Sequence, residues 1–220
     1  MVEISTSILS VKKGEESKTF FALEKAKTDY FHIDVMDGSF VPNLACGMKM
    51  IHGLKGVADL VFDVHLMVNE PVRFVKRMQE AGADVISVHY EACSNVAETL
   101  KEIKQCGIRA GIVLNPETSA EVLTEEIWKL ADVIQVMTVH PGRDGQHFIE
   151  DTLDKIKDIR RRSTDTGEWK DIEVDGSINC GNIGKVIKAG ANIIVSGKAL
   201  FNGNLAENIA NMKQQAAMEE

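Results

Sequence analysis

The chain has 220 residues, of which 44% are hydrophobic and 26% are charged, and its formal net charge at pH 7 is -8. This composition is typical of a globular protein that can bury a sizeable core. The negative charge argues against a nucleic-acid partner, because such binding requires clustered Lys and Arg side chains. No segment has the apolar length of a membrane span, and the first residues lack the pattern of a secretory leader. We therefore expect a cytoplasmic protein with no membrane partner.

The four cysteines do not indicate disulfides or a zinc site. They form no CxxC pair, and a chain of this length does not need disulfides to be stable. We expect reduced thiols at Cys46, Cys93, Cys106 and Cys180. Cys180 has no apparent base partner, which predicts an inert thiol.

Short β-rich runs alternate with longer segments of helical period along the whole chain. We predict strands at 4–9, 30–35, 61–66, 85–89, 109–114, 133–137, 171–174 and 193–195. We predict helices at 15–27, 47–54, 72–80, 96–105, 120–130, 148–162, 183–189 and 205–215. Eight β–α units predict an α/β fold, the (β/α)8 TIM barrel, as a single domain over residues 1–220. Length alone would also allow two smaller domains, but no linker interrupts the series.

An open doubly wound sheet is the main alternative fold. Such a sheet usually has fewer strands and carries a nucleotide-binding fingerprint. The chain has no GxGxxG after a predicted strand and no GxxxxGK[ST]. The barrel is therefore the better interpretation.

Polar side chains occupy alternate positions at the ends of several predicted strands. In FHIDVM, the side chains of His32, Asp34 and Met36 share one face of the strand, opposite an apolar face. The same alternation occurs at Asp63, His65 and Met67, at Gln135 and Met137, and at Glu173 and Asp175. In a barrel these faces point inward, and the interior opens into the active site at the C-terminal rim.

Two imidazoles and two carboxylates at this rim could hold one divalent metal ion. Neutral His nitrogen and Asp oxygen together suit zinc, iron, manganese or cobalt. A single HxD on a strand is more often a hydrogen-bonded structural pair. Four such groups together favour a functional site, because burying them without a metal or proton transfer would carry a large desolvation cost.

Six segments of the chain resemble the ribulose-phosphate 3-epimerase family, that is, the ketose-phosphate 3-epimerases. They are SILS, FHIDVMDGSFVPN, FDVHLMV, HPGRDGQHFI, EVDGSI and VSGKALF, in the order and spacing of that family. The resemblance implies a (β/α)8 barrel that inverts C3 of D-ribulose 5-phosphate to give D-xylulose 5-phosphate. The partner it implies is a phosphorylated ketose, and we expect a homo-oligomer whose subunit number the sequence leaves open.

The resemblance also implies roles for particular residues. His32, Asp34, His65 and Asp175 resemble the ligands of one divalent metal ion, and Asp34 and Asp175 resemble the acid/base pair. Ser10, Met36, His65, Met67 and Met137 resemble substrate-binding residues. Gly142 and Gly145 resemble phosphate-binding positions in a loop that covers the site after the sixth predicted strand, here called the covering loop. Gly176, Ser177, Gly197 and Lys198, after the last two predicted strands, resemble phosphate-binding positions too.

The chemistry of epimerisation explains these residue types. Removing a proton α to a ketone needs a Lewis acid on the carbonyl oxygen to stabilise the cis-enediolate. Inversion then needs one base on each face of this planar intermediate, which two aspartates from different strands can provide. Methionines suit the walls because they are apolar and cannot donate protons to the intermediate.

Three segments depart from the common family pattern. The chain has PGRDGQ, VDGS and SGK where ribulose-phosphate epimerases usually have PGFGGQ, VDGG and SGS. Arg143 and Asp144 place charges in the covering loop where small or apolar residues are usual. These charges can change how the loop closes and the length of substrate that the site accepts. VDGS, FHIDVMDG and LNPET also resemble the D-allulose-6-phosphate 3-epimerases, so that substrate is an alternative. A non-catalytic barrel that binds a sugar phosphate is an alternative function. A decarboxylase of the orotidine-phosphate type would need a Lys–Asp network at the strand ends, and none is apparent in the sequence.

The remaining histidines are weaker candidates. His89 and Glu91 end the fourth predicted strand and either support the metal ligands or form a structural hydrogen bond. His140 is expected to belong to the covering loop. His52 and His147 are expected on helices at the surface.

Overall fold

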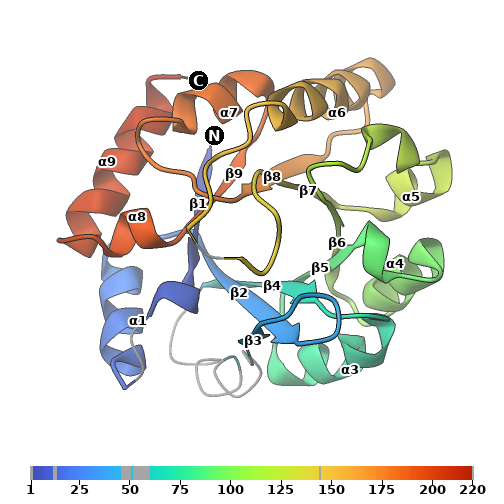
Figure 1. Ribbon diagram of the computed structural model, residues 1–220, viewed down its shortest axis with the longest axis horizontal. Helices are drawn as coiled ribbons and strands as arrows, with labels where there is room; N and C mark the ends of the chain where they lie inside the picture. Colours follow the sequence, from blue (N-terminus) through green and yellow to red (C-terminus); the bar gives the residue numbers. More distant parts are fainter. Residues whose placement is uncertain (1, 12–13, 46–50, 52–59, 144, 220) are drawn as a thin grey trace.

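The computed structural model describes residues 2–11, 14–45, 51, 60–143 and 145–219, in which parallel strands form a closed barrel inside a ring of helices (Figure 1). The strands are β1 (Glu3–Ser7), β2 (Tyr30–Asp37), β4 (Val61–Met67), β5 (Val85–His89), β6 (Arg109–Leu114), β7 (Val133–Met137), β8 (Asp171–Asp175) and β9 (Ile193–Ser196). Each pairs with its neighbour in the order β1-β9-β8-β7-β6-β5-β4-β2, and pairing of β1 with β2 closes the barrel. The (β/α)8 prediction is confirmed.

The helices follow the strands and lie outside the barrel (Figure 1). They are α1 (Glu16–Lys25), α3 (Val72–Ala81), α4 (Val96–Gln105), α5 (Glu125–Leu130), α6 (Thr152–Thr166), α7 (Ile183–Ala189), α8 (Lys198–Phe201) and α9 (Leu205–Ala217). Three 3₁₀ turns, η1 (Ile8–Ser10), η2 (Tyr90–Ala92) and η3 (Ala120–Val122), follow β1, β5 and β6. Within the described part of the chain, no helix has the length and apolar character needed to cross a membrane.

Several predicted boundaries match the structure and others are wrong. The ranges of β5, β6, β7, α4 and α7 agree with the predictions to the residue. The first strand ends at Ser7, because the chain then turns through η1 at the barrel rim. The helix predicted at 120–130 is split, because the Thr124 hydroxyl accepts from the Ile127 N–H and starts a new helix there.

Further differences lie at the C-terminal rim. The helix predicted at 148–162 begins only at Thr152, because the Ile149 N–H first donates to the carbonyl of Thr138. His147 is exposed as predicted, but it lies in this loop and not on a helix. Two elements were not predicted: helix α8 and the short strand β3 (Leu44–Ala45), which pairs antiparallel with the end of β2. The predicted helix at 47–54, apart from the buried Ile51, lies outside the described residues, as do Cys46 and His52.

The hydrophobic core lies between the outer face of the barrel and the helices. Outward-facing strand residues such as Phe31, Ile33 and Val64 are fully buried in it. The middle of the barrel interior is polar instead and holds the buried side chains of Ser5, His32, Asp63, Ser87, Gln135 and Glu173. A small apolar cluster of Tyr30, Val85, Val133 and Ile193 lies nearer the N-terminal ends of the strands. Since burying unpaired polar groups is costly, hydrogen bonds and ion pairs must organise this interior.

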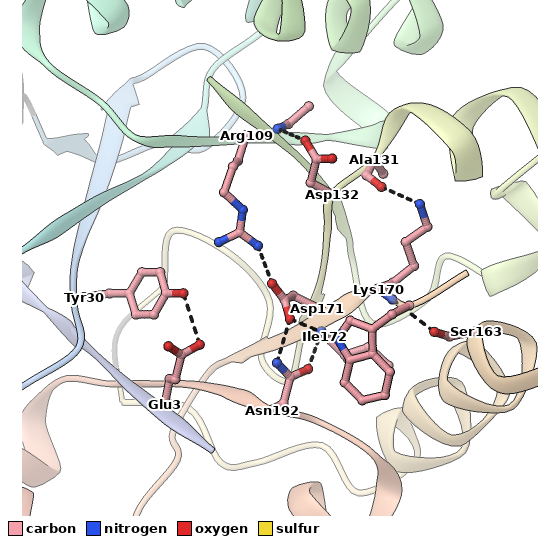
Figure 2. A network of polar contacts seen from close by, with 12 residues as sticks. Glu3, Tyr30, Arg109, Ala131, Asp132, Ser163, Lys170, Asp171, Ile172 and Asn192 are labelled. Carbon is pink, nitrogen blue, oxygen red and sulfur yellow. Dashed lines mark hydrogen bonds and ion pairs between the residues drawn. The ribbon is translucent and has the colours of Figure 1, made fainter. Parts of the chain in front are cut away.

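The N-terminal end of the barrel is closed by a second polar network (Figure 2). The Arg109 guanidinium forms an ion pair with the Asp171 carboxylate. The Asn192 side chain accepts the N–H of Ile172 at 2.8 Å and donates to Asp171 at 2.9 Å. The Asn192 amide oxygen also accepts from Arg160 at 2.8 Å. One amide side chain therefore joins β8, β9 and α6 at this end.

Replacing Asn192 by Ala should lower the free energy of unfolding by about 1–3 kcal/mol, because the buried N–H of Ile172 loses its acceptor. Urea unfolding measures this change. Asn211→Ala is the matched control, since Asn211 is exposed on α9 and should change stability by less than about 0.5 kcal/mol. Equal stability of the two variants would contradict the role given to Asn192.

Candidate active site

A cavity of about 1050 Å³ opens at the C-terminal rim of the barrel. Most of the predicted site residues line it: Ser10, Asp34, Met36, Met67, Met137, Gly142, Gly145, Asp175, Ser177, Gly197 and Lys198. His32 and His65 lie beside its floor and are fully buried. The rim of the barrel therefore brings together residues that lie far apart in the sequence, from Ser10 to Lys198.

Four polar atoms converge at the floor of this cavity. His32 Nε2 lies 3.5 Å from Asp34 Oδ1 and 3.6 Å from Asp175 Oδ2. His65 Nδ1 lies 3.3 Å from the same Asp34 oxygen and 3.6 Å from the same Asp175 oxygen. Asp34 and His65 are aligned in the pairing of β2 with β4, which explains their proximity. All four predicted ligand side chains thus present one atom to a common centre, within 4.8 Å of one another.

The electrostatics of this cluster favour positive charge at its centre. Burial lowers the pKa of His32, but the charges of Asp63 and Asp34 outweigh it and hold this pKa well above the ordinary value. The pKa of His65 is raised to about 9 against burial by its contacts with Asp175 and Asp34. Both carboxyl groups keep pKa values below the ordinary range despite burial, because the two imidazoles face them. Such a centre can attract a cation.

The other ring nitrogen of His32 contacts two further carboxyl groups. His32 Nδ1 lies 2.6 Å from Asp63 Oδ2 and 3.2 Å from Glu173 Oε1. Burial, and then the charge of Asp63, raises the pKa of Glu173 to about 8. The alternation of polar and apolar residues predicted both acids on the inward face, but it predicted no role for them. Their alternate spacing with His65 and Asp175 was the signal for their position.

His65 contacts His89 on the side of its ring away from the cavity. The Nε2 atoms of the two rings are 2.8 Å apart. Burial lowers the pKa of His89 to about 4. Burial raises the pKa of Glu91, but the nearby His89 ring and hydrogen bonds from Thr118 and the Asn115 N–H lower it to about 2 overall.

The covering loop after β7 is held in shape by Gln146. The Gln146 amide donates to the carbonyls of His140 and Arg143 and accepts the His140 N–H. His140 belongs to this loop as expected, and its Nδ1 lies 3.1 Å from a carboxylate oxygen of Glu117. Asp144 lies outside the described residues. A Cβ on Gly142 would lie 2.4 Å from Cβ of Val41, so the loop packs closely on the segment after β2.

Ser177 connects the loop after β8 to this covering loop. The Ser177 hydroxyl donates to the Gln146 carbonyl at 2.7 Å. The Ser177 backbone is left-handed, with φ +55, which residues other than glycine rarely adopt. The preceding Gly176 also has positive φ, and a Cβ there would lie 2.7 Å from the backbone nitrogen of Val139. Gly197 lies close to Ser10, because an added Cβ would be 3.0 Å from the Ser10 hydroxyl oxygen.

Comparison with known proteins assigns the chain to a family. The model of the ribulose-phosphate 3 epimerase family matches residues 3–201. The chain belongs to this family. The ribulose-phosphate 3-epimerase of Bacillus subtilis is 43% identical over 91% of the chain and 93% of that protein. The family also includes a ribulose-phosphate 3-epimerase of Escherichia coli, 41% identical over 90% of the chain and 88% of that protein.

A third epimerase relative comes from a plant. The chloroplastic ribulose-5-phosphate-3-epimerase of Arabidopsis thaliana is 43% identical over 96% of the chain and 75% of that protein. More distant solved structures share the fold alone. A 3-hexulose-6-phosphate synthase has a TM-score of 0.70 at 17% identity, covering 97% of the chain and 99% of that structure. The KGPDC structure of Streptococcus mutans has a TM-score of 0.72 at 12% identity, covering 99% of each chain.

The strained backbone of Ser177 predicts an unusual order of stabilities in this epimerase-family chain. Ser177→Ala should be less stable than Ser177→Gly by about 1 kcal/mol, because both lose the hydroxyl but only alanine keeps the cost of positive φ. Urea unfolding of the two variants measures the difference. A Ser177→Ala variant as stable as Ser177→Gly would contradict the strain assigned to this residue.

Proposed function

We propose that the chain is a ribulose-phosphate 3-epimerase that interconverts D-ribulose 5-phosphate and D-xylulose 5-phosphate. The observation that supports this most strongly is the convergence of His32 Nε2, His65 Nδ1, Asp34 Oδ1 and Asp175 Oδ2 at the cavity floor. The names of the relatives support ribulose 5-phosphate over D-allulose 6-phosphate as the substrate.

The four converging atoms fit one divalent ion. Two imidazole nitrogens and two carboxylate oxygens suit zinc, iron, manganese or cobalt. His32 Nε2 is buried and has no hydrogen-bond partner among the described residues, which is costly unless a cation accepts its lone pair. When bound, such an ion supplies a Lewis acid that lowers the free-energy cost of negative charge on the substrate carbonyl oxygen.

Asp34 and Asp175 are the groups that would move the proton. Their side chains are 7% and 18% exposed and line the cavity, so a substrate can reach them. They come from β2 and β8, which are separated by β1 and β9 on the shorter path around the barrel. A substrate carbon between them would have one carboxylate on each face. One of them, as the carboxylate, can then remove the C3 proton, and the other, as the carboxylic acid, can give its proton to the opposite face, which inverts C3.

The cavity walls are suited to a planar intermediate of the substrate. Met36, Met67 and Met137 line the cavity although each is at most 6% exposed. Their thioethers offer apolar, polarizable contact without a proton to donate. We assign Ser10, which lines the same cavity beside Gly197, to a further contact with the substrate. His65 is fully buried, and its two ring nitrogens face the metal position and His89.

We place the phosphate group of the substrate at the loops after β8 and β9. Barrels commonly bind phosphate through backbone N–H groups at this position. Gly176, Ser177, Gly197 and Lys198 would supply these groups, and the ammonium of Lys198 could add an ion pair. Gly142 and Gly145 of the covering loop would enclose the phosphate from the other side.

Asp175→Asn should lower kcat by about 100-fold or more, because the amide keeps the size of the carboxyl group but cannot accept the proton. A coupled assay with D-ribulose 5-phosphate measures turnover, and Asp165→Asn on the exposed side of α6 is the matched control. In deuterated water the wild-type product should acquire deuterium at C3. Complete retention of the original C3 hydrogen would contradict the two-aspartate scheme, and a wild type that binds the sugar phosphate without exchange would indicate a non-catalytic barrel.

A further inference from the structure

A row of three side chains leads from His65 away from the cavity. His65 on β4 contacts His89 on β5 through their Nε2 atoms, 2.8 Å apart. Nδ1 of His89 lies 3.4 Å from Oε2 of Glu91 on η2. We propose that His89 and Glu91 are positioning residues that hold His65 in the tautomer whose Nδ1 lone pair faces the metal position. This inference rests on the metal site of the proposed function.

The direction of the hydrogen bonds follows from the surroundings of His65. A hydrogen bond between two Nε2 atoms requires that only one of them carries the proton. The Gln135 amide nitrogen lies 3.3 Å from His65 Nδ1 and can donate to it only when Nδ1 carries a lone pair, which is also the form of the ring that binds a metal through this atom. The proton of neutral His65 is therefore on Nε2 and is donated to His89. His89 then carries its own proton on Nδ1, the atom that faces Glu91.

Glu91 is anchored at the far end of this row. Its Oε1 atom accepts the Asn115 N–H at 3.0 Å and the hydroxyl of Thr118. The Asn115 and Pro116 carbonyls accept in turn from the Lys155 ammonium at 2.6 and 2.9 Å. Lys155 belongs to α6, so a helix outside the barrel fixes the segment that holds Glu91. The LNPET segment, residues 114–118, therefore has a structural role in the site, because it holds Glu91 in place.

The three side chains are enclosed, so no other group can easily replace His89 as the acceptor for the His65 N–H. His65 and His89 are both fully buried, and the Phe40 ring lies 4.7 Å from the His89 ring, centroid to centroid. If His89 lost its acceptor nitrogen, the Nε2–H of His65 would be a buried donor without a partner. The proton would then be more stable on Nδ1, where it would block the lone pair that binds the metal.

Titration of the metal-stripped full chain with Co²⁺, against a chromophoric chelator at fixed pH, tests the inference. His89→Leu should raise the Co²⁺ dissociation constant by about 10–100-fold, the usual effect of removing a partner of a metal-ligating histidine. His89→Gln should restore much of the affinity, because its amide oxygen can accept the His65 N–H. Ser87→Ala is the control, since it alters a buried polar side chain on the same strand that has no partner among the described residues.

The outcomes separate the inference from the proposed function. Thermal unfolding of the metal-free variants reports whether each is folded. If His89→Leu is unfolded, Glu91→Ala is tested in its place, and we expect it to bind Co²⁺ more weakly than the wild type. If the variant that is tested binds Co²⁺ with wild-type affinity, the positioning role is wrong, although the metal site still stands. A wild type that binds no Co²⁺ would overturn the metal site and the positioning role together.

Discussion

The site depends on one fully buried imidazole, that of His32. Its two ring nitrogens contact carboxyl groups from β2, β4 and β8, with Asp63 at 2.6 Å on one side and Asp34 and Asp175 on the other. An ionised group in an apolar interior is destabilised unless it is paired, so these strands must meet in one register for the interior to be stable. The requirement that stabilises the interior also presents His32 Nε2 to the cavity floor. The same pairing of His32 with carboxyl groups therefore stabilises the barrel interior and shapes the candidate active site.

The division between strands and loops explains which parts of the site could vary. The converging nitrogen and oxygen atoms come from side chains on β2, β4 and β8, whose positions are fixed by pairing around the whole barrel. The described residues that depart from the family pattern, Arg143, Ser177 and Lys198, lie in loops or at the start of α8. Ser177 joins two of these loops through its hydroxyl, so a change in one loop is coupled to the geometry of the other. Loops on a rigid scaffold can alter the fit of a substrate without moving the catalytic groups.

Much of this arrangement could be predicted from the sequence. The alternation His32, Asp34, Met36 gave the inward face correctly, because side chains in a strand alternate without exception in a regular ladder. The central strands β5 to β7 were predicted to the residue, since apolar runs bounded by turn signals mark them clearly. The sequence could not show that Gln146 fixes the covering loop or that Thr118 holds Glu91. These contacts depend on loop conformations, which no periodicity encodes. The helix α8 was missed because four residues are too few for a helical pattern to be visible.

The most direct test of the account is an anomalous difference map from crystals of an active preparation, recorded at the absorption edge of the metal found in it. The account predicts one peak per chain, between His32 Nε2, His65 Nδ1, Asp34 Oδ1 and Asp175 Oδ2, at ligand distances of about 2.0–2.2 Å if the metal is zinc. An active preparation with no peak between these four atoms would contradict it.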